Sequence, residues 1–291
     1  MITLYLMGLK GYNALKELHN SQLLFLVDAV VSDVDVNVVD DYYEEIKDFC
    51  GSANLCFYNR KDKYDISSKY AIAIAWRWLI DCEKTKLIVL HDSLLPKYRG
   101  FAPLVNMLIH REPYIGVTAL WATEQYDNGD IIDQQKVAVK YPIRISDAID
   151  MLLPLYAHIT CSIVKQLKDN GEIISTPQDE RDATYSLWRD EDDYRIDWNK
   201  SSEEILQFVY SVGFPYRGAS TLCNGKLVRV LDCELFNDVV LVERQVGKVI
   251  FVDNGCPVVV CGKGLLKLTS VVMDIDGTSL LPIKRFRSRF C

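Results

Sequence analysis

The feature that most constrains the fold is a change of hydrophobic pattern after about Thr176. Before it, short apolar runs alternate with amphipathic helical patterns; after it, one helical pattern is followed only by short alternating runs. Apolar runs separated by helices predict a mainly parallel sheet covered on both faces. The runs are "ITLYLMG", "LLFLVDAVVSDV", "NLCFYN", "AIAIAWRWLI", "KLIVLH", "GVTALWAT" and "QQKVAV", and helices are predicted at "YNALKELHN", "DDYYEEIKDFCG" and "APLVNMLIHRE".

The last element of this first part is a long helix, predicted over 145–171. Ser146 is a residue type that caps helix N-termini, and Gly171 is the type that ends helices in a left-handed conformation. We therefore predict Ser146 as the N-cap and Gly171 as the stop signal.

The second part of the chain has a different texture. Residues 177–200 are polar and charged and are predicted to form a linker with few core positions. Ser201 and Glu204 then form a capping-box pattern at the start of a helix. The Asn-Gly pairs at 224–225 and 254–255 lie between apolar runs and predict hairpins. Residues 201–291 are therefore predicted to form a small β-rich barrel or sandwich.

Charge and cysteine content exclude some classes of function. The net charge of the 291 residues is −7, which argues against nucleic acid as the main ligand, because phosphate binding needs clustered cations. The nine cysteines lack the close pairing of zinc sites, so we expect buried reduced thiols and no metal. The N-terminal run has no basic segment before it and predicts a strand rather than a signal peptide. We expect a cytoplasmic protein.

Polar side chains follow two of the predicted strands. His91 ends "KLIVLH", and Asp127 lies in "ATEQYDNGDII", directly after "GVTALW". If these strands are parallel, both loops leave the same edge of the sheet, where α/β proteins bind ligands, and the two residues can meet. A histidine paired with a carboxylate is a poised general base, whereas a lone histidine at a strand end is more often structural. The stretch "GLKG" at 8–11 lacks the GxGxxG spacing and predicts a tight turn.

Two motifs at this position make the sequence resemble a known family. The first motif lies in "HDSLLPKYRG", and its positions are His91, Ser93, Leu94, Leu95, Pro96, Tyr98, Arg99 and Gly100. The positions of the second motif are Asp127, Gly129, Ile131 and Gln134. Both resemble the formyltransferases that use N10-formyltetrahydrofolate, most closely the sugar N-formyltransferases. "RIDWNKSSEEI" resembles the start of the C-terminal domain of the two-domain members. The resemblance implies a Rossmann-like catalytic domain over 1–176, a linker over 177–200 and an OB-like domain over 201–291.

One position departs from the family pattern. The family has an Asn two residues before the histidine, and its amide helps to hold the formyl oxygen as it becomes an oxyanion. Here that residue is Val89. Loss of one such donor costs on the order of 3 kcal/mol of transition-state stabilisation. Asn106, Asn128 and protonated His91 are the candidate substitutes. Asp92 is also unusual beside the histidine, and it would raise the imidazole pKa if it faced inward.

The resemblance also implies which residues bind the two substrates. His91 and Asp127 are the candidate catalytic residues. N10-formyltetrahydrofolate is the expected formyl donor, and the candidates to bind it are Trp76, Arg77, Trp78, Ile80, Glu124, Tyr126 and Asp127. The candidates to bind the acceptor are Ser93, Lys97, Tyr98, Arg99, Gly100 and Asn106.

The acceptor is predicted from charge. Residues 180–291 hold 15 Lys plus Arg against 16 Asp plus Glu, a net charge of −1, with one basic cluster between Lys284 and Arg289. That is weak support for tRNA. Lys97 and Arg99 suit a pyrophosphate, to which Arg217 could add, and Tyr98, Tyr216 or Trp188 could stack on a base. We predict a nucleotide-linked 4-amino sugar as acceptor, no nucleic-acid or membrane partner, and a homodimer. Three alternatives stay open: a methionyl-tRNA formyltransferase, a hydrolase that releases formate from formyltetrahydrofolate, and a silent folate-binding protein.

Overall fold

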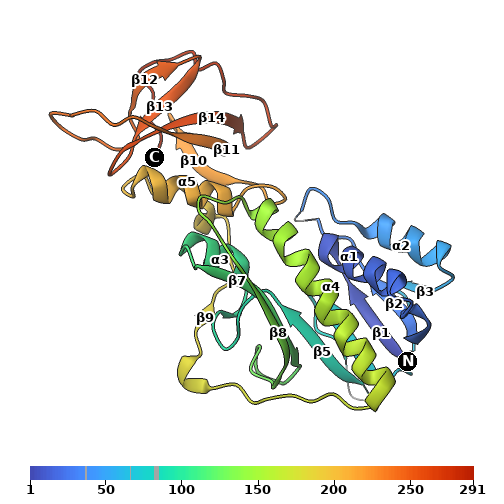
Figure 1. The fold of residues 1–291 in the computed structure, drawn as a ribbon. Helices are drawn as coiled ribbons and strands as arrows, with labels where there is room; N and C mark the ends of the chain where they lie inside the picture. The colour runs from blue at the N-terminus through green and yellow to red at the C-terminus, as the bar shows by residue number, and fades with distance from the viewer. Residues whose placement is uncertain (37, 66, 82–84) are drawn as a thin grey trace. The chain divides into compact units, whose positions relative to one another are not determined.

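The structure, a computed structural model, describes residues 1–36, 38–65, 67–81 and 85–291. It divides into two compact units, which are coloured by residue number in Figure 1. Unit 1 comprises Met1–Leu104, Pro113–Val139 and Ala148–Leu187, and unit 2 comprises Val105–Glu112, Lys140–Asp147 and Trp188–Cys291.

Unit 1 is built on a seven-stranded sheet in the order β3-β2-β1-β4-β5-β7-β8. Its strands are β1 (Ile2–Leu6), β2 (Val27–Ser32), β3 (Cys56–Asn59), β4 (Tyr70–Ile74), β5 (Lys86–His91), β7 (Tyr114–Trp121) and β8 (Ile131–Ala138). The strands from β3 to β5 in this order are parallel to one another, whereas the pairs β5–β7 and β7–β8 are antiparallel. The predicted α/β class with a mainly parallel sheet is confirmed.

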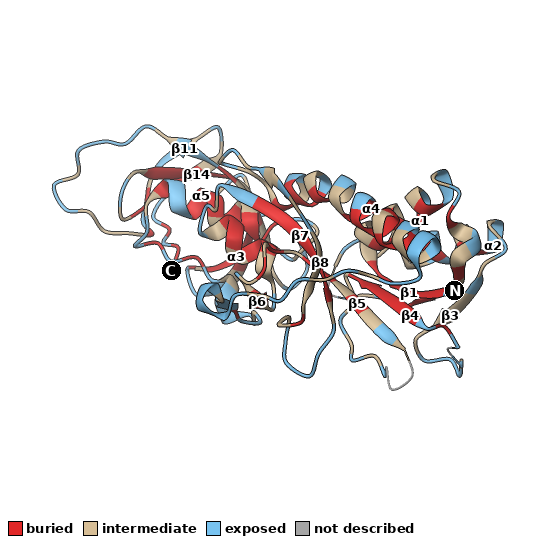
Figure 2. Ribbon diagram, turned by 60° about the horizontal axis from the view of Figure 1, so that its bottom comes forward, coloured by how far each residue is buried: buried red, intermediate tan, exposed pale blue. Residues whose placement is uncertain are grey.

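Helices cover one face of this sheet. Figure 2 shows α1 (Gly8–Asn20), α2 (Tyr43–Ser52) and α4 (Ile145–Asn170) on the same side of the strands. The other face carries Tyr5, Val31, Ala71 and Ala73, against which loop side chains such as Trp76 pack. The sheet is thus covered on both faces, as predicted, but the second face is covered by side chains of loops and strands rather than by helices. The reason is that the connections 60–69 and 75–85 are short, and their described residues form no helix.

Two local predictions about helix starts need correction. The helix α4 begins at Ile145, so Ser146 lies inside its first turn and is not the N-cap; such boundaries are commonly misplaced by a residue. Gly171 has φ 70° directly after the last helical residue and fits the predicted stop. The "GLKG" stretch is not a tight turn but the first turn of α1, which begins at Gly8.

The helix α4 is long and apolar enough to cross a membrane by length and composition. However, 56% of its apolar window is buried inside the protein. Figure 2 shows α4 lying over the strands of unit 1, with buried residues along its length. That burial is expected of the core helix of an α/β unit.

Unit 2 is β-rich, as predicted. It contains a five-stranded antiparallel sheet in the order β10-β11-β14-β13-β12, together with α3 (Pro103–Ile109) and α5 (Ser202–Ser211). Its strands are β10 (Ala219–Cys223), β11 (Lys226–Phe236), β12 (Val249–Asp253), β13 (Cys256–Val260) and β14 (Leu265–Met273). Both Asn-Gly pairs join antiparallel neighbours and have positive φ at both residues, which confirms the hairpins. The capping box of Ser201 and Glu204 is also present.

Candidate active site

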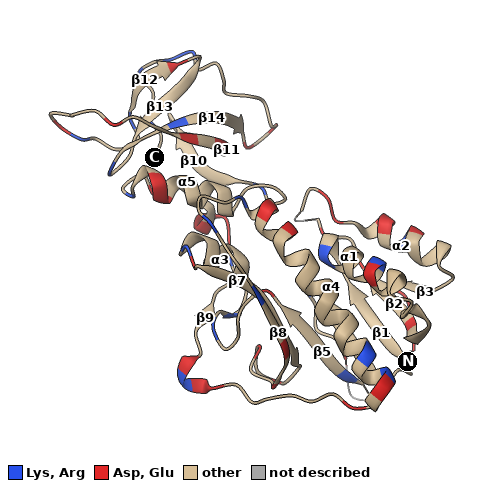
Figure 3. Ribbon diagram, in the orientation of Figure 1, with Lys and Arg blue, Asp and Glu red and all other residues tan. Residues whose placement is uncertain are grey.

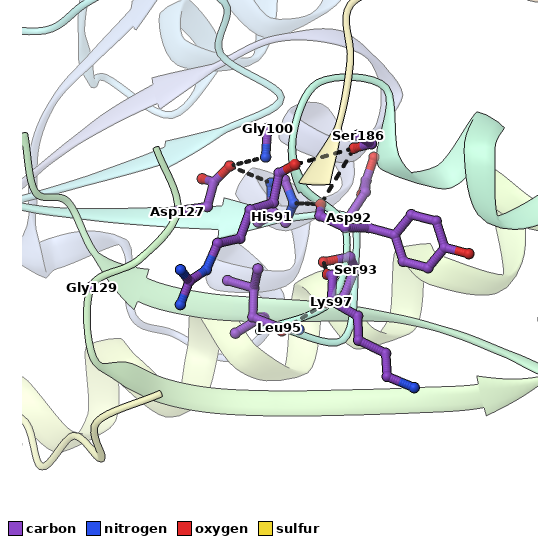
Figure 4. A network of polar contacts seen from close by, with 12 residues as sticks. His91, Asp92, Ser93, Leu95, Lys97, Gly100, Asp127, Gly129 and Ser186 are labelled. Atoms are coloured by element: carbon purple, nitrogen blue, oxygen red, sulfur yellow. Dashed lines mark hydrogen bonds and ion pairs between the residues drawn. The ribbon is translucent and has the colours of Figure 1, made fainter. Parts of the chain in front are cut away.

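His91 ends β5, and a buried turn fixes its ring (Figure 4). The side chain is on the same face of the strand as Val89, because side chains alternate along a strand. Its Nε2 lies 2.8 Å from the backbone O of Tyr98, in the loop that follows the strand. A carbonyl only accepts hydrogen bonds, so Nε2 carries a hydrogen. In the neutral ring, Nδ1 is therefore the atom with the free lone pair.

Asp127 meets His91, but not by the predicted route. Because β5 and β7 are antiparallel, with Ile88 opposite Trp121, the end of β7 lies about three residues short of His91 along β5. The loop 122–130 between β7 and β8 instead folds back along the sheet. It brings Asp127 Oδ2 to 3.5 Å from His91 Nδ1, as Figure 4 shows. Hydrophobic runs do not encode strand direction, which explains the wrong assumption of parallel strands.

The carboxylate of Asp127 and the imidazole of His91 form a largely buried pair. The side chains of His91 and Asp127 are 8% and 16% exposed, and Oδ2 also accepts a hydrogen bond of 2.8 Å from the backbone N of Gly100. A separation of 3.5 Å is too long for a strong hydrogen bond to the neutral ring. If Nδ1 takes up a proton, however, the carboxylate stabilises the resulting positive charge. The arrangement can therefore accept one proton at Nδ1.

The backbone around the pair is strained. Tyr98 and Asp127, which both contact His91, have φ of 60° and 53°, a region that non-glycine residues seldom adopt. Such conformations cost on the order of 1–3 kcal/mol and persist where neighbouring contacts hold them, most often at functional sites. Tyr98 is held by a 2.9 Å hydrogen bond from its N to Thr184 Oγ1.

Both motif glycines are required by close backbone approaches. A Cβ on Gly100, whose φ is 97°, would lie 2.6 Å from the backbone O of Ser186. A Cβ on Gly129 would lie 1.9 Å from the backbone O of Trp121. A side chain at Gly100 would displace the backbone at Ser186, and one at Gly129 would displace the loop that carries Asp127.

Arg99 does not fit the predicted role of binding a pyrophosphate. Its side chain is 1% exposed, and it is tied to Glu180 by Nη1 at 2.9 Å and Nη2 at 2.8 Å. Nε and Nη2 also donate to Gln178 Oε1, and Nη1 donates to Tyr185 Oη at 3.3 Å. These bonds occupy all the N–H groups of a guanidinium. The hydrogen bond from Arg99 lowers the pKa of the Glu180 carboxyl, which keeps this pair charged.

The residues that engage Arg99 belong to the predicted linker. Between Thr176 and Ser186 this segment pairs with Ile131 and then runs beside 98–101, where β9 (Tyr185–Ser186) pairs with β6 (Arg99–Gly100). Few residues of this first part are buried, yet it makes specific backbone and side-chain hydrogen bonds to the rest of unit 1. Its polar side chains face buried partners, so composition gave no signal; the domain boundaries themselves remain a prediction.

Two other predicted acceptor residues have different surroundings. Ser93 is fully buried and donates to the backbone O of Lys97 at 2.7 Å, so it shapes the turn and has no free hydroxyl hydrogen for a ligand. Lys97 is exposed, and Figure 4 shows its side chain extending away from His91. Gln134 of the second motif donates to the backbone O of Leu95 at 2.9 Å and also holds this turn.

The position that lacks the family amide is apolar. Val89 is half-buried and, like Trp76 and Ile80, packs against the apolar cluster on the face of the sheet that carries no helices. Of the candidate substitutes, Asn106 belongs to unit 2, where its Oδ1 accepts from Arg189. The Asn128 amide is bonded within its own loop, to Thr123 and Gln125, both at 2.7 Å.

Asp92 does not face the histidine. Its Oδ2 pairs with Lys10 Nζ, and its Oδ1 accepts from Tyr156 Oη at 2.5 Å. The predicted effect of Asp92 on the imidazole therefore rested on the wrong orientation. Alternation along the backbone turns successive side chains to opposite sides. Asp92 instead joins α1 and α4 to the end of β5.

The candidate donor-binding residues lie in two loops of unit 1. Trp76 contacts Tyr5 and Trp78 edge to face, at ring-centroid distances of 5.0 and 5.2 Å. Its Nε1 is buried and has no hydrogen-bond partner in the described part of the chain. Arg77 pairs with Asp35 at 2.8 Å, and Ile80 packs in the same apolar cluster. In the second loop Glu124 is exposed, and Tyr126, 67% exposed, contacts the ring of Phe101 at 5.4 Å.

No group of three or more His, Cys, Asp and Glu side chains that could hold a metal lies together in the described ranges.

Comparison with known proteins gives matches to both units. A sequence model described as formyl transferase matches residues 73–148, and one described as formyl transferase, C-terminal domain, matches 189–286; together they span more than half of the chain. The chain is 27% identical over 232 residues to a methionyl-tRNA formyltransferase of Fusobacterium nucleatum, an alignment that covers 75% of this chain and 74% of that protein.

Solved structures share the fold. An N-formyltransferase from Helicobacter canadensis, in complex with folinic acid and dTDP-3-aminofucose, superposes with a TM-score of 0.66 at 16% identity, covering 92% of this chain and 98% of that one. HypX from Aquifex aeolicus in complex with tetrahydrofolic acid superposes with a TM-score of 0.64 at 18% identity. That alignment covers 94% of this chain but 44% of HypX, so the chain spans less than half of that protein.

Proposed function

The chain belongs to the formyl transferase family, and from that premise we propose that it transfers a formyl group from N10-formyltetrahydrofolate to a primary amine of a nucleotide-linked amino sugar. The observation that carries the proposal is the pair formed by His91 Nδ1 and Asp127 Oδ2, which lie 3.5 Å apart in a largely buried position at the end of β5. A general base there is what acyl transfer to an amine requires.

The proposed reaction accounts for each proton that moves. The neutral amine nitrogen attacks the formyl carbon, and the bond from that carbon to N10 of the folate breaks. The amine loses a proton to His91 Nδ1, while Asp127 stabilises the imidazolium that forms. The leaving N10 then takes up a proton, which His91 returns in this scheme. Because Nε2 is held by Tyr98 O, the ring keeps one orientation through the cycle.

The donor is proposed to bind on the face of the sheet that carries no helices, beside Val89. Trp76 supplies a flat apolar surface there, and its Nε1 is a buried donor without a partner in the described residues. A pteridine ring offers both a flat π-face and acceptor atoms at its edge. A buried N–H that lacks a partner costs free energy in the unliganded protein, so a ligand acceptor at this point would bind favourably.

The proposed acceptor follows from the charges of unit 2. Figure 3 shows Lys and Arg interspersed with Asp and Glu over its strands and loops. Several of its cations are paired within the unit: Arg229 with Glu191, Lys267 with Asp253, and Arg244 with Asp238. Arg217 pairs with Asp274 at 3.3 Å, so its predicted role at a pyrophosphate has a competitor. A large polyanion is poorly matched by such a surface.

Methionyl-tRNA is the second candidate acceptor, because the curated relative from Fusobacterium nucleatum is named for it. The basic residues near the C-terminus, Lys284, Arg285 and Arg287, are the part of unit 2 that favours it. The two candidates differ in charge and size, so one assay separates them.

The experiment supplies N10-formyltetrahydrofolate with a nucleotide-linked 4-amino-4,6-dideoxyhexose, with methionyl-tRNA, or with no acceptor. Formylated sugar supports the proposal, and formylated methionyl-tRNA moves the acceptor to the second candidate. Formate released without acceptor identifies a hydrolase. Folate binding without any turnover identifies a silent binding protein. A thermal-shift panel of dTDP, UDP, GDP and CMP sugars then finds the nucleotide, because stabilisation rises with ligand concentration over Kd.

A further inference from the structure

Gln178 has an unusually complete set of hydrogen bonds for a side chain at the edge of a loop. Its Nε2 donates to the backbone O of Asp127 at 2.8 Å and to the backbone O of Gly129 at 2.7 Å. Its Oε1 accepts from Arg99 Nε at 3.2 Å and Nη2 at 2.8 Å. A primary amide has two donor hydrogens and two acceptor lone pairs, so every position of Gln178 is used.

Arg99 decides which way this amide points. A guanidinium has only donors, so the side facing Arg99 must be the oxygen, and the NH2 group must then face the loop. Arg99 cannot turn away, because Glu180 and Tyr185 hold its remaining N–H groups. Arg99 and Gln178 together therefore present two fixed donors to the loop 122–130.

The two carbonyls that receive these donors lie on either side of Asn128, and one of them belongs to Asp127 itself. The carboxylate of the same residue is held at its other end by the backbone N of Gly100, at 2.8 Å. Asp127 is thus fixed at its main chain by Gln178 and at its side chain by Gly100. Both contacts help to hold its backbone in the strained left-handed conformation, with φ of 53°.

We propose that Gln178 is a positioning residue for the transfer reaction, which sets the distance between Asp127 Oδ2 and His91 Nδ1 by clamping the loop 122–130 to the buried Arg99. Gln178 touches neither His91 nor the reacting atoms; it acts through Asp127. This inference rests on the proposed function, because a role in formyl transfer is what the clamp would serve. A misplacement of about 1 Å in such a pair costs on the order of 10² in rate.

The sharpest variant is Gln178→Glu, which has almost the same shape. The oxygen facing Arg99 is retained, and the ion pair with the guanidinium keeps the segment 176–186 attached. The group facing the loop changes from a donor to an acceptor, so two carbonyls meet a carboxylate oxygen and the loop is released. We expect the single-turnover rate of formyl transfer to fall about 10- to 100-fold, with KM for the formyl donor changed less than threefold.

The control variant is Arg181→Gln. Arg181 lies on the same turn, is 89% exposed and pairs only with Asp179 in the contacts described. Its removal changes only the surface of the segment 176–186 and leaves the hydrogen bonds between Arg99 and Gln178 in place. Its transfer rate should equal that of the wild type.

A second measurement does not depend on activity. The amide of Gly100 is hydrogen-bonded to Asp127, whereas the neighbouring amides of Arg99 and Phe101 are bonded to Thr184 O and Ser186 O. In Gln178→Glu, hydrogen exchange at Gly100 should rise at least about tenfold, while exchange at Arg99, Phe101 and the β5 amides stays within about twofold of the wild type. A general loss of structure would raise all of them together.

The outcomes separate the clamp from the proposed function. A slow Gln178→Glu enzyme with fast exchange confined to Gly100 supports the clamp. Wild-type rates, unchanged exchange at Gly100, or increased exchange throughout β5 would overturn it. If the wild-type protein formylates no acceptor, the proposed function fails, and the exchange at Gly100 alone then decides whether Gln178 positions Asp127.

Discussion

Nδ1 of His91 faces Oδ2 of Asp127 across 3.5 Å, while Nε2 of the same ring is held by the backbone O of Tyr98 at 2.8 Å. One nitrogen is thereby fixed as a donor to the backbone, and the other, Nδ1, lies beside a carboxylate. The two residues that set this geometry, Tyr98 and Asp127, both have left-handed backbones. Hydrogen bonds from surrounding residues therefore hold these two loop residues in backbone conformations that non-glycine residues seldom adopt.

The first prediction concerns His91 itself. His91→Asn should lower the single-turnover rate of formyl transfer by at least about 10², because general acid–base groups contribute 10²–10⁴ to rates. Asn keeps a polar side chain near Tyr98 O but has no basic nitrogen. The measurement is rapid-quench transfer with saturating donor, with tetrahydrofolate binding as the control for folding. Transfer within a factor of three of the wild type would remove His91 from the role of base.

The second prediction concerns the backbone of Gly100. Gly100→Ala places a Cβ 2.6 Å from Ser186 O at a φ of 97°, so we expect a loss of about 1–3 kcal/mol of unfolding free energy and slower transfer. Gly171→Ala is the matched control, since φ there is 70° but no atom lies within 4 Å of the new Cβ. Urea unfolding and transfer rates of both variants test this. Equal behaviour of the two would show that the approach to Ser186 is unimportant.

The third prediction is a pH dependence at Asp33, a buried carboxylate next to the candidate donor site. Burial alone would raise its pKa, but hydrogen bonds from Arg60 Nε, Val34 N and Asn59 outweigh burial and lower the pKa below 3.8. A lowered folded-state pKa contributes stability above about pH 3.8 and loses it as the pH falls through the folded value. Asp33→Asn should therefore cost about 1–3 kcal/mol at pH 7 and progressively less below pH 3.8.

Urea unfolding of wild type and Asp33→Asn at pH 7, 5 and 3 measures this difference. The gap between the two proteins should be the same at pH 7 and 5 and smaller at pH 3. A gap that stays constant to pH 3 would show that the ionised carboxylate contributes nothing beyond an amide.

Local sequence patterns correctly predicted several turns, one helix start and the fold class. The Asn-Gly pairs are hairpin turns, and Ser201 with Glu204 forms a capping box, because the physical cause of each lies within a few neighbouring residues. The alternation of apolar runs and helices gave the α/β class for the same reason. The motif residues also pointed to the loops that hold His91 and Asp127.

Contacts between segments that are far apart in the sequence could not be predicted from it. The reversal of β7 against β5 leaves no trace in hydrophobicity, since a buried strand has the same composition in either direction. Arg99 has the residue type of an anion-binding group, yet Glu180 and Gln178, about eighty residues later, consume its donors. Their stretch resembles a linker in composition because its buried side is made of polar contacts rather than apolar ones.

The fourth prediction uses the unpaired donor of Trp76. Trp76→Phe removes the buried Nε1–H, which has no partner in the described residues, and otherwise keeps an aromatic ring. We expect the free protein to become more stable by up to about 1–3 kcal/mol and the folate donor to bind about tenfold more weakly. Trp121→Phe, at the far end of β7, is the control. Calorimetry with tetrahydrofolate measures both effects, and an unchanged Kd would exclude a hydrogen bond from Trp76 to the ligand.

The last prediction concerns Val89, where related enzymes are expected to carry an amide. Val89 is on the same face of β5 as His91, two residues earlier, and, like Trp76, packs against an apolar cluster. Val89→Asn would place an NH2 donor beside the formyl oxygen. Because one oxyanion donor is worth about 10²–10³ in kcat, the variant should transfer formyl groups faster than the wild type. Burying an amide against this cluster should also lower the unfolding free energy by about 1–3 kcal/mol. Val89→Thr, which has nearly the same shape but a shorter donor, is the control. A folded Val89→Asn protein that is no faster than Val89→Thr would mean that another group already holds the oxyanion, and protonated Nδ1 of His91 is then the donor to examine.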